Sequence, residues 1–297
     1  MADMTLTKKE DNLYTGVIKK YDMNHLSVRI IYYMVFAVCL MIMIVCVFPF
    51  LWTILSSFKT IKEFASEPNI IPHQFQFSGF IKTWTSLKFV KYYMNSAISV
   101  LGSIVCAIIF NGMFGYVLSK VRPFGSKVFE MLVMWGLLIP ATTSIVPLFM
   151  NLSKLGLTGT FIPLWLSMGA NAFYVVLFKN FFDSLPASYI EAATIDGAGN
   201  VTIFFKIVVP LSKSIIMVVG LYAITAAWSD FLLPFLLLQN TAFETVMVKL
   251  FSLMRGAKIN DVEMLRAIVF AIIPPVILFI IFQKQITQVT IQSGIKG

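Results

Sequence analysis

Residues 185–211 read LPASYIEAATIDGAGNVTIFFKIVVPL, a comparatively polar stretch between strongly apolar parts of the chain. Within it, Ser188 and Glu191 have the spacing of a capping box at a helix N-terminus. Gly197 or Gly199 suits the end of that helix, because glycine adopts the left-handed conformation that ends many helices. The stretch therefore predicts a short helix of roughly ten residues.

The middle of this short helix is built for close approach. Ala192 and Ala193 carry only methyl side chains, so another protein can come close to the helix surface. Glu191 either stabilises its own helix N-terminus or contacts the partner, and both roles are compatible. Further on, Asn200 can cap a second helical piece and Pro210 can begin the next long helix. We interpret the segment as a docking element.

The sequence on either side is typical of a membrane protein. The chain has 297 residues, of which 58% are hydrophobic and 12% charged, and its mean hydropathy is +0.85. Such a composition fits a membrane domain better than a soluble core. Runs of uncharged or nearly uncharged residues, each long enough to cross roughly 30 Å of hydrocarbon, cover 30–58, 92–119, 131–153, 155–178, 214–238 and 267–283. We expect an all-α integral membrane protein with six transmembrane helices and the docking helix between helices 4 and 5.

Two apolar runs need comment. The first has 29 residues, which exceeds the apolar core of a cleavable signal peptide, and no small-residue cleavage site follows. We expect it to be retained, so that a transmembrane domain extends over 28–284. The last run contains Pro274 and Pro275, which a membrane helix tolerates when neighbours or water satisfy the carbonyls that they free.

An even number of spans places both termini on one side of the membrane. The short connection 120–127 carries three basic residues, whereas Lys154 alone separates the third and fourth runs. Under the positive-inside rule this difference favours cytoplasmic termini. We therefore expect cytoplasmic segments at 1–27 and 285–297, with the docking loop, about 179–213, on the same side.

Several functional classes lack support in the sequence. The net charge of +9 comes from scattered basic residues without a concentrated basic stripe, so we expect no nucleic-acid partner. The three cysteines lie inside apolar runs and the two histidines are isolated, which argues against a metal site. The chain contains no G-x-x-x-x-G-K-[ST] sequence, so we expect no cofactor in this chain, and any ATP hydrolysis must occur on another polypeptide.

The docking segment has a counterpart in a known family. The pattern Glu191-Ala-Ala, Gly197 six residues after the glutamate, and then Ile207 and Pro210 resembles the EAA loop of ATP-binding-cassette (ABC) importer permeases. Over about 90–297 the chain is similar to the carbohydrate-uptake branch, specifically to the shorter permease of the maltose-transporter type. Val209 departs from that pattern, because leucine is usual before the proline. The other similar stretches are Tyr93-Met-Asn95-Ser96 through Phe114-Gly-Tyr116, Ile139-Pro140, Val146-Pro147-Leu148, Leu155-Gly-Leu157, Phe181-Phe182 to Pro186, Trp228-Ser-Asp230-Phe231-Leu-Leu-Pro234, and Phe282-Gln-Lys284 to Gly294-Ile-Lys-Gly297.

The resemblance implies a type I ABC importer permease fold in a bacterial cytoplasmic membrane. It implies that the chain is not an enzyme and forms half of a translocation pathway for a sugar or oligosaccharide. Its partners would be a second permease subunit, two cytoplasmic ATPase subunits that bind ATP and Mg²⁺, an extracytoplasmic solute-binding protein, and membrane lipid. The coupling helix that docks into the ATPase would contain Glu191, Ala192, Ala193, Asp196, Gly197 and Pro210.

Polar and aromatic residues in the apolar runs are candidates for the solute path. They are Asn111, Asn171, Trp228 and Asp230. Each has a structural alternative: asparagines in membrane helices bond to neighbouring helices, tryptophan anchors at the membrane interface, and Asp230 can lie at the outer interface. The competing function is an ion-coupled secondary transporter. That class predicts an internal repeat and membrane carboxylates, whereas the chain shows no repeat and few acidic residues in the runs.

Overall fold

The computed structural model describes residues 25–256 and 259–294, and every regular element in these ranges is a helix. The all-α class expected from the sequence is confirmed. Three helical stretches are individually long and apolar enough to cross a bilayer. They are α2 (Leu26–Ser57), α5 (Phe89–Tyr116) continued by the π-helical turn η3 (Val117–Val121), and α16 (Asp261–Gly294), which was tested as far as Gln283.

Three further stretches qualify only as bent pairs of helices, which would raise the number of spans to six. The bends measure 92°, 42° and 85° in chain order. The pairs are α6 (Ser126–Leu138) with 142–154, which includes α7 (Ile145–Lys154), then α8 (Ile162–Gly169) with α9 (Ala172–Asp183), and 200–211 with α13 (Lys213–Ser229). The segment 200–211 consists of α11 (Asn200–Ile203), the π-helical turn η5 (Phe204–Val208) and α12 (Val209–Leu211).

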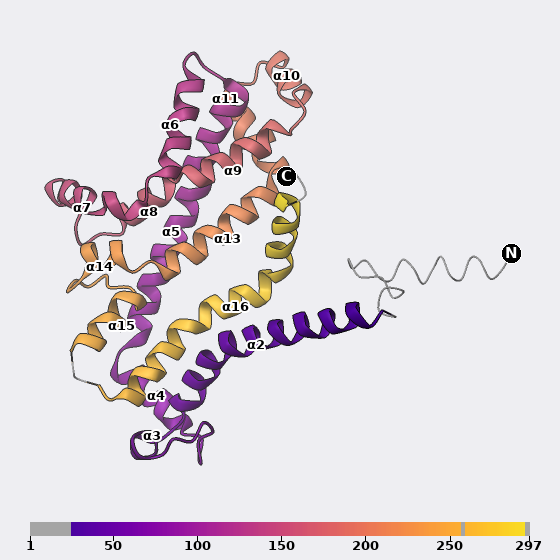
Figure 1. Cartoon of the computed structure of the whole chain (residues 1–297). Coiled ribbons are helices and arrows are strands. Elements are labelled where there is room, and N and C mark those ends of the chain that lie inside the picture. The colour runs from indigo at the N-terminus through magenta and orange to yellow at the C-terminus, as the bar shows by residue number, and fades with distance from the viewer. Residues whose placement is uncertain (1–24, 257–258, 295–297) are drawn as a thin grey trace.

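Short helices lie at the two ends of the long ones (Figure 1). At one end are the helices that follow α2, and at the opposite end is the short helix between α9 and α11. The helices after α2 are α3 (Ile61–Ser66) and α4 (Phe77–Ser86), and the helix between α9 and α11 is α10 (Ser188–Ile195). The other short elements are η4 (Ala141–Ser144), α14 (Leu232–Leu238) and α15 (Val246–Arg255).

Helix α5 is the centre of the bundle, since α8, α9 and α13 all pack against it. Gly115 permits the close contact with α9: a Cβ there would lie 2.8 Å from the Cβ of Phe178 and 3.0 Å from the backbone nitrogen of Lys179. The main cluster of buried apolar residues, which includes Ala107, Phe178 and Val219, occupies this region. The bundle core therefore lies between span two and the elements that carry the predicted docking loop.

Three apolar runs are interrupted where the sequence analysis treated them as continuous, and one of them is 155–178, which bends by 42° between α8 and α9. The run 131–153 breaks at Ile139, whose backbone is extended with φ −86° and ψ 119°. Pro140 explains this break, because the residue before a proline is disfavoured in the α conformation. The fifth run ends at Ser229 rather than continuing to 238: Asp230 is extended and a separate helix, α14, follows it.

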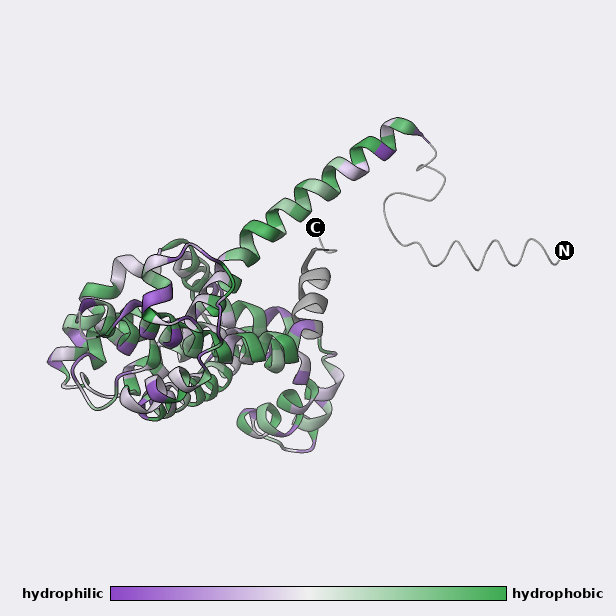
Figure 2. Cartoon of the chain, turned by 90° about the horizontal axis from the view of Figure 1, so that it is seen from below, coloured by the Kyte–Doolittle hydropathy of each residue, from purple (hydrophilic) through white to green (hydrophobic). Residues whose placement is uncertain are grey.

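Helix α2 projects away from the rest of the molecule (Figures 1 and 2). None of its most apolar 18-residue window is buried. Apolar residues cover its surface (Figure 2), as expected for a helix in contact with lipid or another membrane subunit. The predicted cytoplasmic segment at 1–27 lies mostly outside the described residues, and the backbone of α16 remains helical to Gly294.

Candidate coupling helix and solute path

The predicted docking helix is α10, Ser188–Ile195. Its N-cap is Ala187, and no side chain caps it. The capping box expected from the sequence is therefore not formed, because the helix begins with Ser188 already inside it. The carbonyl of Ala187 instead accepts hydrogen bonds from the backbone N–H groups of Ile190 and Glu191 at 2.9 and 3.0 Å. Glu191 lies in the first turn, where its charge favours the helix dipole.

The helix ends as the sequence predicts, at Gly197, whose φ is +80°. The N–H of Gly197 donates to the carbonyl of Thr194 at 3.0 Å, and the N–H of Ala198 donates to that of Ala193 at 2.9 Å. This pair of bonds is a Schellman motif. A Cβ on Gly197 would have no atom within 4 Å, so glycine is required here by backbone conformation and not by crowding.

One side of α10 faces the protein and the other is exposed. Ala193 is 8% exposed and belongs to the main buried cluster. Glu191, Ala192 and Asp196 are exposed, and Ile195 is 86% exposed. The helix thus rests on its own bundle through Ala193 and presents the other side chains outward.

Hydrogen bonds fix the base of α10 to the turn between α5 and α6. The Lys120 ammonium donates to the carbonyl of Leu185 at 2.7 Å, three residues before α10 begins. The hydroxyl of Ser119 donates to the Asp183 carboxylate, also at 2.7 Å. Displacement of α10 would therefore act on η3, at the end of the long helix that begins with α5, as well as on α9.

An ion-pair network extends this connection to α6. Lys179 lies 2.9 Å from Glu130 and 2.9 Å from Asp183, and Arg122 lies 3.6 Å from Asp183. The carboxylate of Asp183 thus joins α9 to the end of span two, while Lys179 joins α9 to α6. Three helices meet at the point from which α10 projects.

The chain after α10 differs in detail from the sequence expectation. Gly199 is the N-cap of α11 and Asn200 is its first residue, so Asn200 does not act as a cap. Pro210 lies inside α12, and the span α13 begins only after an 85° bend. Between them, the ring of Phe204 in η5 packs 5.5 Å from that of Tyr116 at the end of α5.

Two asparagines predicted for the solute path, Asn111 and Asn171, form hydrogen bonds at the bend between α8 and α9. Asn111 is fully buried, and its amide group donates to the carbonyls of Ala107 at 2.8 Å and Met168 at 2.9 Å. Its side-chain oxygen accepts the backbone N–H of Asn171 at 2.9 Å. The side chain of Asn171 in turn caps α9 by accepting from Phe173 and Tyr174. Bonding between helices, the structural alternative raised for these residues, is therefore present.

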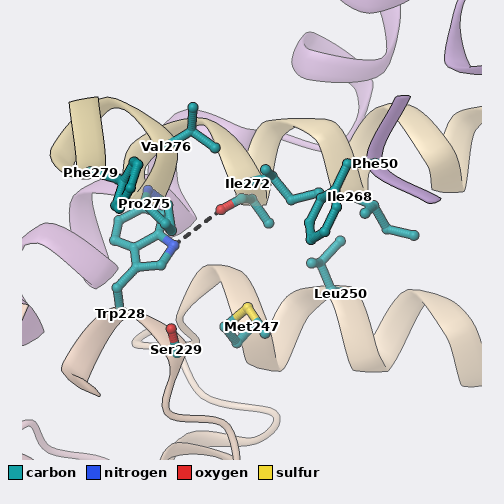
Figure 3. A pocket seen from close by; sticks show the side chains of 11 residues that line it. Phe50, Trp228, Ser229, Met247, Leu250, Ile268, Ile272, Pro275, Val276 and Phe279 are labelled. Atoms are coloured by element: carbon teal, nitrogen blue, oxygen red, sulfur yellow. Dashed lines mark hydrogen bonds between the residues drawn. The ribbon is translucent and has the colours of Figure 1, made fainter. Parts of the chain in front are cut away.

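Trp228 also has a defined structural partner. Its indole N–H donates to the carbonyl of Ala271 at 3.1 Å, shown as the dashed line in Figure 3. In a regular helix that carbonyl would accept from residue 275, but Pro275 has no N–H. The prediction that neighbours satisfy the carbonyls freed by the double proline is confirmed at this position.

Known proteins are similar to this chain both in sequence and in the arrangement of the helices. Residues 107–292 match the family described as "Binding-protein-dependent transport system inner membrane component", which is more than half of the chain. The chain belongs to this family. The permease is 30% identical over 248 residues, 82% of each chain, to the diacetylchitobiose uptake system permease protein NgcG of Streptomyces coelicolor. It is 27% identical over 281 residues to the polygalacturonan/rhamnogalacturonan transport system permease protein YtcP of Bacillus subtilis, covering 89% of this chain and 97% of that one.

A solved structure confirms the fold of the permease. It is a chain of a bacterial ABC transporter involved in the import of the acidic polysaccharide alginate. The TM-score is 0.77 with 24% sequence identity, over 91% of this chain and 99% of that chain. The ABC importer permease fold implied by the sequence resemblance is therefore confirmed, and the chain is a component of a membrane transporter.

Beside Trp228 the permease has an apolar cavity of about 530 Å³ (Figure 3). Trp228, Met247 and Leu250 line one side, Phe50 of α2 closes one end, and residues of α16 including Pro275 form the other side. The only side-chain hydroxyl among the lining residues is that of Ser229. A sugar needs more hydrogen-bonding groups than this lining supplies, so the cavity is not by itself a complete sugar site.

Asp230 follows α13 directly and is half-buried. Its carboxylate lies beside the backbone N–H groups of Leu232 and Leu233 at the start of α14, and it can accept hydrogen bonds from them. Its assignment to the solute path stays a prediction. Among the described residues, no group of three or more His, Cys, Asp or Glu could hold a metal ion.

Sequence reasoning missed the residues that position these elements. From the sequence, Lys120 is only one of the basic residues that indicate membrane topology, and nothing distinguishes Asp183 from other acidic residues. Tyr93 was noted only as part of the family resemblance, yet its hydroxyl donates to the carbonyl of Phe270, which Pro274 leaves without a helical donor. The double proline predicts that two carbonyls of its helix need hydrogen-bond donors from elsewhere, but the sequence does not indicate which helices supply these donors.

Proposed function

We propose that the permease forms half of the path by which a sugar or oligosaccharide enters a bacterial cell, driven by ATP that a separate ATPase subunit hydrolyses. The named relatives support the substrate class: one is an uptake permease for diacetylchitobiose and another a transport permease for polygalacturonan or rhamnogalacturonan. The relative of known structure belongs to a transporter of alginate, which is also a carbohydrate.

The observation that carries the proposed mechanism is the placement of α10. The helix is exposed at one end of the molecule, is anchored through Ala193, and is tied to span two by the bond from Lys120 to Leu185. We propose that Glu191, Ala192 and Asp196 contact the ATPase while the Gly197 turn fixes the helix end. Pro210 lies beyond the contact, at the bend that leads into span five.

The proposed assembly follows from what one chain can supply. It has one candidate coupling helix and no phosphate-binding loop sequence. A two-fold ATPase dimer offers two equivalent docking sites, so a second permease is required. ATP and Mg²⁺ would bind to the two ATPase subunits, and an extracytoplasmic binding protein would deliver the solute. Both termini would be cytoplasmic, on the side of α10.

For the solute path, we propose roles of two kinds. Trp228 and Asp230 lie near a cavity wall and a helix break, where a change between two bundle conformations can expose them. Asn111 and Asn171 would affect transport through the bend between α8 and α9, since their polar groups are used in hydrogen bonds. Alternating access then consists of a two-state bundle that ATP biases at one face and the loaded binding protein at the other.

Co-purification tests this proposal. A tagged copy is expressed at native level in its native host and extracted in mild detergent, and its stoichiometric partners are identified by mass spectrometry. We expect a second permease and an ATPase that contains a phosphate-binding loop. The control carries a bulky charged residue at Ala192, which should lose the ATPase and keep the second permease. Recovery of this chain alone, with transport that needs no ATP after reconstitution, would instead indicate a secondary transporter.

A further inference from the structure

A second protrusion lies at the same end of the permease as α10. It is the turn 122–125 between η3 and α6, and Phe124 is at its tip. The relative exposure of Phe124 is 107%, the highest among the large apolar side chains of the described residues. No other described part of the chain covers the ring. A single exposed apolar side chain is not by itself evidence of a contact, but a phenylalanine held at the tip of a turn at the same end as α10 can insert into a partner that covers α10.

The backbone holds this ring in a defined position. Gly125 has φ 85° and ψ −1°, and the N–H of Ser126 donates to the carbonyl of Pro123 at 3.0 Å. These are the features of a type II turn, in which Phe124 is the second residue. Arg122 is also left-handed, with φ 46°, and its guanidinium donates to the carbonyl of Ser119 at 2.6 Å. The turn is thus fixed on both sides of the phenylalanine.

The helix that precedes the turn is long enough to hold it beyond the lipid hydrocarbon. The helix Phe89–Val121 has 33 residues, which corresponds to about 50 Å at 1.5 Å per residue. The hydrocarbon core is only roughly 30 Å thick. Lys120, Arg122 and Lys127 flank the tip in the sequence, and such residues are enriched beside the membrane on the cytoplasmic side. Phe124 therefore faces the aqueous side rather than the acyl chains.

A hydrogen bond and an ion pair connect the turn to the residues just before α10. Lys120, two residues before the turn, donates to the carbonyl of Leu185, which precedes α10. Arg122 lies 3.6 Å from Asp183 at the end of α9. In Figure 1 the connection between α5 and α6 and the helix α10 project at the same end of the molecule. A protein large enough to cover α10 would meet this turn as well.

We infer that the turn 122–125 is a second contact with the ATPase subunit, in which the ring of Phe124 inserts into an apolar site next to the coupling-helix cleft. The inference rests on the proposed function, because it takes the ATPase as the partner of α10. Arg122 and Lys127 flank Phe124 in the sequence and are exposed, so we expect acidic residues at the edge of the site on the ATPase.

Photo-crosslinking in the assembled transporter tests the contact. The photoreactive p-benzoylphenylalanine replaces one residue at a time, at Phe124, at Ile195 on α10, and at Leu155 in the turn between the third and fourth spans. Leu155 is the matched control, since it is 71% exposed in a turn but lies between different helices. Crosslinked products are identified by mass spectrometry. Phe124→Ala is also measured, with Leu155→Ala beside it.

We expect probes at 124 and 195 to crosslink to the ATPase, and the probe at 155 not to. Phe124→Ala should lower the ATP hydrolysis stimulated by the binding protein by roughly fivefold or more, as removal of a central aromatic interface residue commonly does. Crosslinking at 195 alone would overturn the second contact and leave the coupling helix in place. A probe at 124 that reacts only with lipid or with this chain would overturn it as well. Failure at both positions would contradict the proposed docking of α10.

Discussion

The indole N–H of Trp228 lies 3.1 Å from the carbonyl oxygen of Ala271, which has lost its helical donor to Pro275. Helix α13 thus supplies the hydrogen bond that α16 cannot make within itself. Tyr93 of α5 supplies the corresponding bond one residue earlier, to Phe270. Helices α5 and α13 are therefore connected to α16 at two successive carbonyls.

Trp228→Phe keeps most of the aromatic volume and removes the donor. We expect it to lower the free energy of unfolding by about 1–3 kcal/mol, the usual cost of leaving a buried polar group unpaired. The midpoint of thermal unfolding of the purified complex measures this loss. Pro275→Ala restores a backbone donor for Ala271, so in that background Trp228→Phe should cost much less. Equal losses in both backgrounds would show that the hydrogen bond does not explain the effect.

Asn111→Leu should destabilise the permease by about 2–5 kcal/mol, because it leaves the carbonyl of Met168 and the N–H of Asn171 unpaired in the bundle. The exposed Asn151 provides the control, and Asn151→Leu should change stability little. Thermal unfolding and sugar affinity are measured on the same preparations. An Asn111→Leu protein of normal stability with weakened sugar binding would assign Asn111 to the solute path instead.

Gly197 allows a direct test of the end of the proposed coupling helix, since its surroundings leave room for a side chain. Gly197→Val should lower stimulated ATP hydrolysis strongly, because the left-handed backbone costs a β-branched residue roughly 1–2 kcal/mol and distorts the helix end. Gly197→Asn should retain most activity, since asparagine tolerates this conformation. Membrane levels of both variants should match the unmodified protein. Identical losses in the two variants would mean that side-chain bulk, and not conformation, is the cause.

At the opposite end, the pKa of Glu63 is held below its ordinary value of 4.5, chiefly by the backbone N–H of His73 and then by the side chain of Asn69. A lowered pKa means that this carboxylate contributes stability above pH 4.5, and that the contribution disappears as the pH falls through the lowered value. Thermal unfolding followed between neutral pH and about pH 3 should show a steeper loss for the unmodified protein than for Glu63→Gln. Parallel pH profiles would contradict this account.

The sequence predicted the long apolar helices well, because their runs of apolar residues are local signals. It did not predict the break at Ile139, although Pro140 is a local signal for it. The bend between α8 and α9 had no local signal of comparable strength: it depends on Asn111, which lies 60 residues before Asn171 in the chain. Long-range hydrogen bonds of this kind become visible only when the helices are placed side by side.

At the candidate site, too, local features could be predicted from the sequence and long-range contacts could not. The short helix and its end at Gly197 could be predicted because the glycine signal and the family pattern are both local, whereas the predicted capping box of Ser188 and Glu191 was wrong. The bond from Lys120 to Leu185 could not, since a lysine after a span is equally explained by membrane topology. The unusual exposure of Phe124 likewise follows from the turn conformation at Gly125 and not from composition.

The most direct test is transport by the reconstituted complex. Proteoliposomes contain the permease with its co-purified partners, and uptake of labelled oligosaccharides is measured with the binding protein present and an ATP supply on the ATPase side. We predict uptake that requires ATP, the ATPase and the binding protein, and that is lost when Ala192 is replaced by a bulky charged residue. Uptake that an ion gradient drives without ATP, or that the Ala192 variant retains in full, would contradict the account.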